Sequence, residues 1–116
     1  MNIAAIDHDV DSLYDLTEKL KKTFAEYNVF SFTNPLDLLK FSKTEHIDIL
    51  FTDIRLKPID GYELMKLLQA EQSFLTFIVS GTKQHPDELS WMNINGFYAK
   101  PVTIEELTNL HNKIFS

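Results

Sequence analysis

Four side chains of complementary chemistry stand at the ends of short apolar runs. They are Asp7, Asp53, Ser80 and Lys100, in that order along the chain. If the four runs are parallel strands of one sheet, their carboxyl ends meet at one edge, where open α/β sheets bind ligands. Two carboxylates on adjacent strands attract a hard divalent cation, which can also bind phosphate oxygens.

This combination supplies the groups that phosphoryl transfer needs. Asp53 is the candidate nucleophile, which would form an acyl phosphate. Lys100 and Ser80 would hold the remaining phosphate oxygens, because positioning and charge neutralisation do most of the catalysis. Taken alone, Asp53 has an equally plain interpretation as a residue that ends a strand, since Asp is a common turn former.

The surrounding sequence alternates apolar runs with helical patterns. Strands are predicted over residues 3–6, 27–32, 47–51, 74–79 and 97–99. Apolar residues at spacings of three and four predict amphipathic helices over 13–24, 35–41, 61–68, 85–92 and 103–114. Asp9 or Asp11 can cap the first helix, Asn34 the second, and Thr103 with Glu106 forms a capping box for the last.

Strands that alternate with helices imply right-handed crossovers and a parallel sheet. We therefore predict an α/β fold, a flavodoxin-like doubly wound (βα)5 three-layer sandwich with strand order 2-1-3-4-5. In that order the first and third strands are neighbours, which places Asp7 beside Asp53. The whole chain, residues 1–116, is expected to form one domain.

Composition narrows the function further. The formal net charge of −6 argues against direct nucleic-acid binding, which needs clustered Lys and Arg. The absence of cysteine excludes disulfides and thiolate chemistry. No signal peptide or membrane-spanning run is apparent, so we expect a cytoplasmic protein without membrane contact.

The ordered set of motifs resembles a response-regulator receiver domain (CheY-like). The matching features are Asp7 after a strand, Asp53 in the run 50–53, Pro58 and Gly61 beyond it, and the pairs Ser80-Gly81 and Lys100-Pro101. The resemblance covers nearly the whole chain. It implies that Asp53 accepts a phosphoryl group and that Asp7, its neighbour, Asp53 and the Arg55 backbone carbonyl hold magnesium.

The resemblance also implies a switch and its partners. The hydroxyl of Ser80 would move on activation, together with an aromatic side chain at Phe97, where the family often has tyrosine. The output face would comprise helix 85–92, strand 97–99 and helix 103–114, and Trp91 and Met92 are candidate contacts on it. The expected partners are a histidine kinase or phosphotransfer protein, a downstream effector, and in some receivers a second copy. Such a domain is a phosphoacceptor rather than a turnover enzyme.

His8 departs from the family pattern, which usually has two adjacent acids after the first strand. Imidazole suits zinc, copper or nickel better than magnesium. We therefore expect magnesium affinity to be weak, or metal preference to be altered, unless the site works through Asp7, Asp53 and water. Asp9 could take the role of the second acid, but it is one residue further along and is expected to cap the helix. The other histidines, His46, His85 and His111, lack the mutual spacing of metal ligands and are expected in solvent.

Two other functions remain open. A degenerate receiver would bind partners independently of phosphorylation, its site altered at His8. A small haloacid-dehalogenase-like phosphohydrolase is suggested by the Asp-x-Asp form of residues 7–9, with Ser80 and Lys100 as companions. That family needs a further acidic site after the lysine, and only Glu105 and Glu106 follow.

Overall fold

The computed structural model describes residues 1–81 and 93–115. Within them the chain forms five strands and four helices: β1 (Asn2–Ile6), α1 (Val10–Thr23), β2 (Asn28–Phe32), α2 (Pro35–Ser42), β3 (Ile49–Thr52), α3 (Gly61–Gln69), β4 (Leu75–Ser80), β5 (Gly96–Ala99) and α4 (Ile104–Phe115). The helix predicted over 85–92, with His85, Trp91 and Met92, lies outside the described residues. The last helix, expected as the fifth, is therefore α4.

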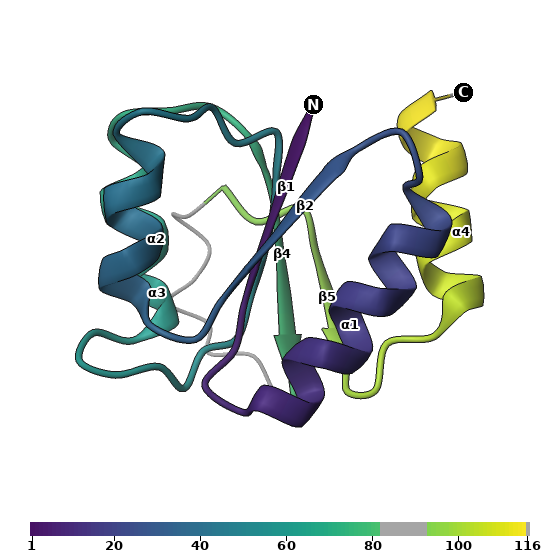
Figure 1. Ribbon diagram of the computed structural model, residues 1–116, viewed down its shortest axis with the longest axis horizontal. Helices are drawn as coiled ribbons and strands as arrows, with labels where there is room; N and C mark the ends of the chain where they lie inside the picture. The colour runs from purple at the N-terminus through teal and green to yellow at the C-terminus, as the bar shows by residue number, and fades with distance from the viewer. Residues whose placement is uncertain (82–92, 116) are drawn as a thin grey trace.

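The strands form one parallel sheet in the order β2-β1-β3-β4-β5. Figure 1 shows the sheet between two layers of helices, with α1 and α4 on one face and α2 and α3 on the other. This is the doubly wound three-layer sandwich that the alternation of strands and helices predicts. None of the described helices is long and apolar enough to cross a membrane.

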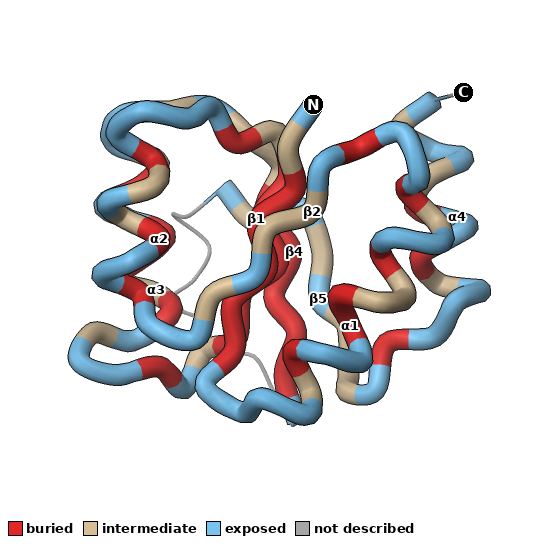
Figure 2. The backbone as a smooth tube through the Cα atoms, in the orientation of Figure 1, coloured by how far each residue is buried: buried red, intermediate tan, exposed pale blue. Residues whose placement is uncertain are grey.

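Each face of the sheet has its own apolar core, and the central strands β1, β3 and β4 between them are buried along almost their whole length (Figure 2). On the α1 and α4 face, Phe51 and Phe77 stack with ring centroids 5.3 Å apart among leucines of both helices. On the opposite face, Leu50 and Ile78 pack against Leu64 and Leu68 of α3. The four residues of β3, Ile49–Thr52, are all buried, as expected for a strand covered on both sides.

Helix starts follow the caps that the sequence offers. The Asp9 carboxylate accepts from the backbone N–H of Asp11 and Ser12 and so caps α1. Asn34 caps α2, Asp60 caps α3, and Thr103 and Glu106 form the reciprocal capping box of α4. Asp9 rather than Asp11 is thus the first cap, and its carboxylate is engaged by the helix.

Differences from the predicted boundaries are small and have local causes. Ile47 is fully buried but precedes β3, because its backbone N–H donates to the side chain of Gln72 instead of a strand. Tyr27 precedes β2 and packs edge-on against Phe24. His111, expected in solvent, is only 25% exposed, because it pairs with Glu26 and lies against the Phe24 ring.

Candidate functional site

The carboxyl ends of β1 and β3 bring the two acids together. The backbone N–H of Asp53 donates to the carbonyl of Ile6 at 3.1 Å, which continues the β1–β3 ladder by one residue. Asp7 is held in the same way by β2, through its N–H to the carbonyl of Phe32 at 3.2 Å. Their side chains are only 5% and 7% exposed, so two carboxylates are buried at one edge of the sheet.

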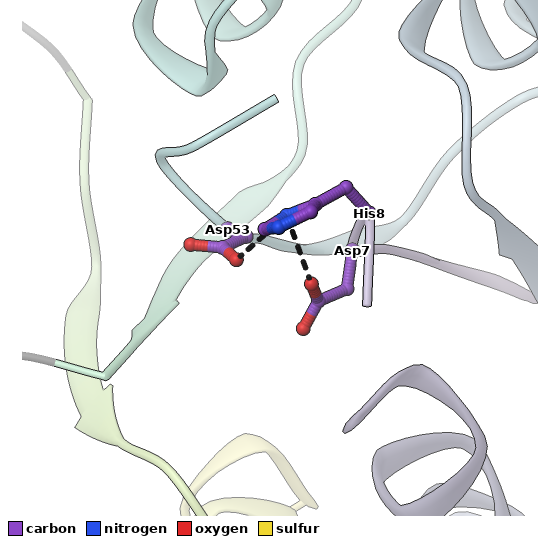
Figure 3. Close-up of side chains that lie close together, drawn as sticks. All are labelled: Asp7, His8 and Asp53. Carbon is purple, nitrogen blue, oxygen red and sulfur yellow. Dashed lines mark ion pairs between the residues drawn. The ribbon is translucent and has the colours of Figure 1, made fainter. Parts of the chain in front are cut away.

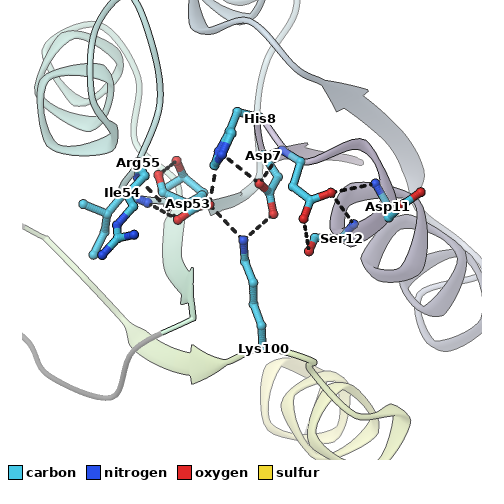
Figure 4. A network of polar contacts seen from close by, with 10 residues as sticks. Asp7, His8, Asp11, Ser12, Asp53, Ile54, Arg55 and Lys100 are labelled. Atoms are coloured by element: carbon cyan, nitrogen blue, oxygen red, sulfur yellow. Dashed lines mark hydrogen bonds and ion pairs between the residues drawn. The ribbon is translucent and has the colours of Figure 1, made fainter.

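Lys100 joins the two acids from the end of β5. Its Nζ lies 2.6 Å from Asp7 Oδ2 and 2.8 Å from Asp53 Oδ2 (Figure 4). The backbone N–H of Lys100 donates to the carbonyl of Ser80, which fixes the start of this side chain beside the end of β4. One partly buried ammonium therefore serves two carboxylates.

His8 stands over the same pair of acids from the opposite side. Its Nδ1 is 3.6 Å from Asp7 Oδ1 and 3.8 Å from Asp53 Oδ2, as Figure 3 shows. The imidazole is 59% exposed, in contrast to the buried carboxylates below it. One ligand atom from each of the three residues lies within 4.8 Å of the others.

Backbone groups fix the orientation of both carboxylates. Asp53 Oδ1 accepts from the N–H of Ile54 at 2.7 Å and of Arg55 at 3.4 Å, so Oδ2 is the oxygen left for Lys100 and His8. Asp7 Oδ1 accepts from the N–H of Asp9 at 2.9 Å. These backbone bonds fix one oxygen of each carboxylate, and Lys100 contacts the other.

Gly61 makes the position of the Asp53 backbone possible. Its N–H donates to the carbonyl of Ile54 at 2.8 Å, which closes the loop between β3 and α3 against the end of β3. A Cβ at residue 61 would lie 2.2 Å from the carbonyl oxygen of Asp53 and 2.9 Å from Ile54 Cα. Only glycine permits this close approach.

An open hollow of about 220 Å³ lies beside Asp53. Its lining residues are His8, Asp53, Arg55, Ser80, Gly81 and Lys100. It is large enough for a phosphoryl group and several waters, each of which takes about 30 Å³. Ser80, which is 8% exposed at the end of β4, thus shares a hollow with Asp53, as the sequence predicts.

Phe97 lies away from this hollow. It is 36% exposed on β5 and lines a separate depression between β5 and α4 with Glu106 and Lys113. Two roles stay predictions, because the geometry alone does not assign them. They are metal binding by the Arg55 backbone carbonyl and movement of the Ser80 hydroxyl on activation.

The charges of the site shift one another's ionisation. Burial raises the pKa of Asp53, but the hydrogen bond and charge of Lys100 outweigh it, so that the pKa lies below its ordinary value. Burial dominates at Asp7 and raises its pKa. Burial also lowers the pKa of Lys100, and its bonds to both acids more than reverse this, so its pKa is raised. Asp53 is consequently the more strongly ionised carboxylate, as a nucleophile must be.

Magnesium fits this donor set only in part. The two buried carboxylates supply the hard oxygen atoms that Mg²⁺ prefers. The third donor is an imidazole nitrogen, which suits later transition metals. Asp9 does not replace it, because its carboxylate caps α1.

The four residues singled out from the sequence, Asp7, Asp53, Ser80 and Lys100, lie close together because the carboxyl ends of parallel strands meet at one edge of the sheet. The sequence does not predict the direct contact between Asp7 and Lys100, because spacing along the chain does not say where a long side chain ends. A second contact that the sequence does not predict joins α1 to the loop between β5 and α4. Lys19 Nζ donates to the carbonyl of Val102 at 2.9 Å.

Comparison with known proteins gives a consistent result. The family model described as the response regulator receiver domain matches residues 3–112. The transcriptional regulatory protein FlgR of Helicobacter pylori is 26% identical over 107 residues, which cover 92% of this chain and 28% of FlgR. YpdB of Escherichia coli K12, also a transcriptional regulatory protein, is 24% identical over 98% of this chain and 47% of its own. The chain thus spans less than half the length of these relatives.

Solved structures agree in fold. The response regulatory domain of mrkE from Klebsiella pneumoniae superposes with a TM-score of 0.86 at 20% identity, over 99% of this chain and 95% of that one. A CheY-like receiver domain from Methylobacillus flagellatus gives 0.82 at 20% identity, over 98% of both chains.

Proposed function

The chain belongs to the response regulator receiver domain family of two-component systems, and we propose that it signals by accepting a phosphoryl group on Asp53. The donor would be the phosphohistidine of a histidine kinase or of a phosphotransfer protein. The observation that carries the proposal is the convergence of Asp53, Lys100 and Ser80 on one hollow, with Asp7 paired to the same Lys100 ammonium.

The reaction is a displacement at phosphorus. A carboxylate oxygen of Asp53 attacks the phosphorus atom, the phosphorus–nitrogen bond of the donor breaks, and the imidazole leaves. The product is an acyl phosphate on Asp53. A depressed pKa keeps Asp53 ionised and ready to attack, and its two backbone hydrogen bonds hold it in position.

Lys100 and Ser80 would bind the phosphoryl group once it is transferred. Lys100 Nζ already contacts Asp53 Oδ2 at 2.8 Å, so a small movement would carry it to a phosphate oxygen. Ser80 lines the hollow from the neighbouring strand and can donate its hydroxyl. A divalent cation held by Asp7 and Asp53 would neutralise the remaining charge of the phosphoryl group.

Output would follow from the change at the ends of β4 and β5. Ser80 and Lys100 are joined by a backbone hydrogen bond, so a shift of one strand end is passed to the other. Phe97, three residues before Lys100, is the candidate aromatic switch on the face formed by β5 and α4. Because the relatives FlgR and YpdB are longer transcriptional regulatory proteins, we infer that this face acts on an effector domain or protein.

A phosphorylation-independent receiver is the second candidate, and His8 is the observation that favours it. The phosphohydrolase alternative is not favoured, because the second acid of its Asp-x-Asp motif, Asp9, is engaged as the cap of α1. Labelling of Asp53 in the presence of any divalent cation would favour the phosphoacceptor over the phosphorylation-independent receiver.

The test is labelling by a small phosphodonor such as acetyl phosphate, with Mg²⁺, Mn²⁺ and Zn²⁺ supplied in turn. We expect intact-protein mass spectrometry to show one added phosphoryl group, lost in Asp53→Asn. The control is Asp48→Asn, another acid beside a strand, which should label normally. Absence of labelling with all three ions would overturn the proposal and leave the phosphorylation-independent receiver.

A further inference from the structure

We propose that Asp7, His8 and Asp53 form a site for a transition-metal ion of the Zn²⁺ type, in preference to Mg²⁺. The inference rests on the proposed function for its purpose, since the ion would serve the phosphoacceptor. It concerns binding alone, however, and is tested without any phosphodonor.

The three donor atoms lie within 4.8 Å of one another, and the spacing of His8 from each carboxylate fits such an ion. Two ligands bound at about 2.1 Å lie about 3.4 Å apart around a tetrahedral zinc ion and about 3.0 Å apart at neighbouring positions around an octahedral magnesium ion. His8 Nδ1 lies 3.6 Å and 3.8 Å from the nearest oxygens of Asp7 and Asp53. These separations are closer to the tetrahedral value, and a slight inward movement of the exposed imidazole closes the difference.

The chemistry of the donors points the same way. One imidazole nitrogen and two carboxylate oxygens are a donor set that Zn²⁺ accepts with a fourth position left for water or phosphate. Mg²⁺ demands oxygen ligands in near-octahedral geometry and gains little from a nitrogen donor. The single residue His8 therefore sets the metal preference of a site whose carboxylates alone would suit magnesium.

The surroundings of the three donors make them a built site. Asp7 Oδ1 and Asp53 Oδ1 each accept a backbone N–H, which fixes both carboxylates before any ion arrives. Both side chains are more than nine-tenths buried, while His8 lies over them at the mouth of the hollow. Figure 3 shows all three turned toward one point.

Lys100 is the internal competitor for this position. Its ammonium contacts the same Asp53 Oδ2 that faces His8. Binding of a divalent ion must release part of this contact, which lowers the affinity for every cation alike. The competition therefore reduces absolute affinity but leaves the preference for Zn²⁺ over Mg²⁺ to His8.

Isothermal titration of the intact chain with Zn²⁺ and, separately, Mg²⁺ tests the proposal. We expect the unmodified protein to bind Zn²⁺ at least about tenfold more tightly than Mg²⁺. His8→Asp should lower Zn²⁺ affinity and raise Mg²⁺ affinity, each by about tenfold. His8→Asn should weaken Zn²⁺ without strengthening Mg²⁺, and guards against a failure of the first variant to fold. Co²⁺ as a probe should give the intense visible absorption of a tetrahedral site.

The matched control is His46→Asn. His46 is also an exposed histidine beside an acid, with Nε2 3.3 Å from Asp48 Oδ1, but it has one carboxylate instead of two. Zn²⁺ binding should survive this change and be lost in Asp53→Asn. Equal affinity for the two ions, a ratio unchanged in both His8 variants, or Zn²⁺ binding lost in His46→Asn would overturn the inference. These outcomes are separate from the labelling of Asp53, which can fail while the metal preference holds.

Discussion

Asp53 Oδ2 lies between an ammonium and an imidazole, and this single oxygen connects the whole site. Lys100 lies 2.8 Å from it and His8 3.8 Å, while the other oxygen is held by backbone N–H groups. Lys100 compensates two acids at once, so its removal leaves two carboxylates buried without a counter-charge. The cost of an uncompensated buried charge is large.

The Lys100→Met variant should therefore show two opposite effects. The free energy of unfolding should fall by about 2 kcal/mol at neutral pH, because a buried ion pair is broken. Affinity for a divalent cation should rise by about tenfold or more, because the competing ammonium has gone and two negative charges remain. Urea unfolding and isothermal titration measure the two effects.

Lys19→Met is the matched control for this variant. Lys19 is similarly covered, with a side chain 24% exposed against 21% for Lys100, and it also pairs with an aspartate at 2.8 Å. Its partner Asp15 is 48% exposed, and Lys19 also donates to the Val102 carbonyl, so loss of both contacts should cost about 1 kcal/mol, less than Lys100→Met, and leave metal affinity unchanged. Similar losses in both variants would show that the acid pair does not depend on Lys100.

Gly61 is a second residue whose effect can be stated in advance. Gly61→Ala would place a methyl group 2.2 Å from the Asp53 carbonyl oxygen, so the end of β3 must shift. We expect the free energy of unfolding to fall by about 2 kcal/mol. Asp53 labelling should slow by at least about tenfold, because the nucleophile is displaced. Gly81→Ala is the control, since its added Cβ meets nothing within 4 Å; an equal loss of stability in both variants would contradict the steric argument.

At the scale of elements, the ends of three strands bring the site residues together. Asp7, Asp53 and Lys100 extend β1, β3 and β5 by one residue each. α1 begins at Val10, only three residues after Asp7, and its cap at Asp9 engages the one nearby acid that could have joined the site. The position of this cap is why His8, and not Asp9, faces the two carboxylates.

The sequence is informative about these elements because their signals are local. Buried strands appear as apolar runs, caps as Asp, Asn or Thr before a helical period, and the parallel order follows from their alternation. Lys100 is different, since its reach across to Asp7 depends on the twist of the sheet and on a flexible side chain. His111 likewise pairs with Glu26, 85 residues away in sequence, which no local pattern indicates.

The pair of His111 and Glu26 links α4 to the segment that follows α1, and it predicts a pH effect. The hydrogen bond from His111 lowers the pKa of Glu26 below its usual 4.5. A carboxyl whose folded-state pKa is depressed adds stability above its unfolded value and loses it as the pH falls through the folded value. Urea midpoints of the unmodified protein and Glu26→Gln should therefore differ at neutral pH and converge as the pH falls below 4.5.

Glu18→Gln serves as the control for this link. Glu18 pairs with Lys21 within α1 alone, so its loss tests a surface ion pair that joins no two elements. The midpoint of this variant should lie close to that of the unmodified protein across the same range. If Glu26→Gln behaves in the same way, the contact between α4 and the α1–β2 segment contributes nothing to stability.

At the scale of the whole molecule, the site sits where both cores end. The sheet is covered by one apolar cluster with α1 and α4 and by another with α2 and α3, and the radius of gyration of 13.0 Å is that of a compact chain of this length. Strands β1 and β3 contribute alternate residues to both clusters. A ligand bound at the ends of these two strands should therefore stabilise both cores together.

Occupation of the phosphoryl position should accordingly stabilise the entire fold. Beryllofluoride, a phosphoryl mimic, with a saturating divalent ion binds only the native site, so at one hundred times its dissociation constant it adds about 2.7 kcal/mol. For a domain of this size that corresponds to about 10 °C in Tm. Circular dichroism should report this increase for the whole molecule, and hydrogen exchange should show it in both α3 and α4, which lie on opposite faces of the sheet. Asp53→Asn, measured with the same ions, should show none of it. An increase that persists in this variant would place the mimic elsewhere, and one confined to the site loops would mean that the two cores unfold separately.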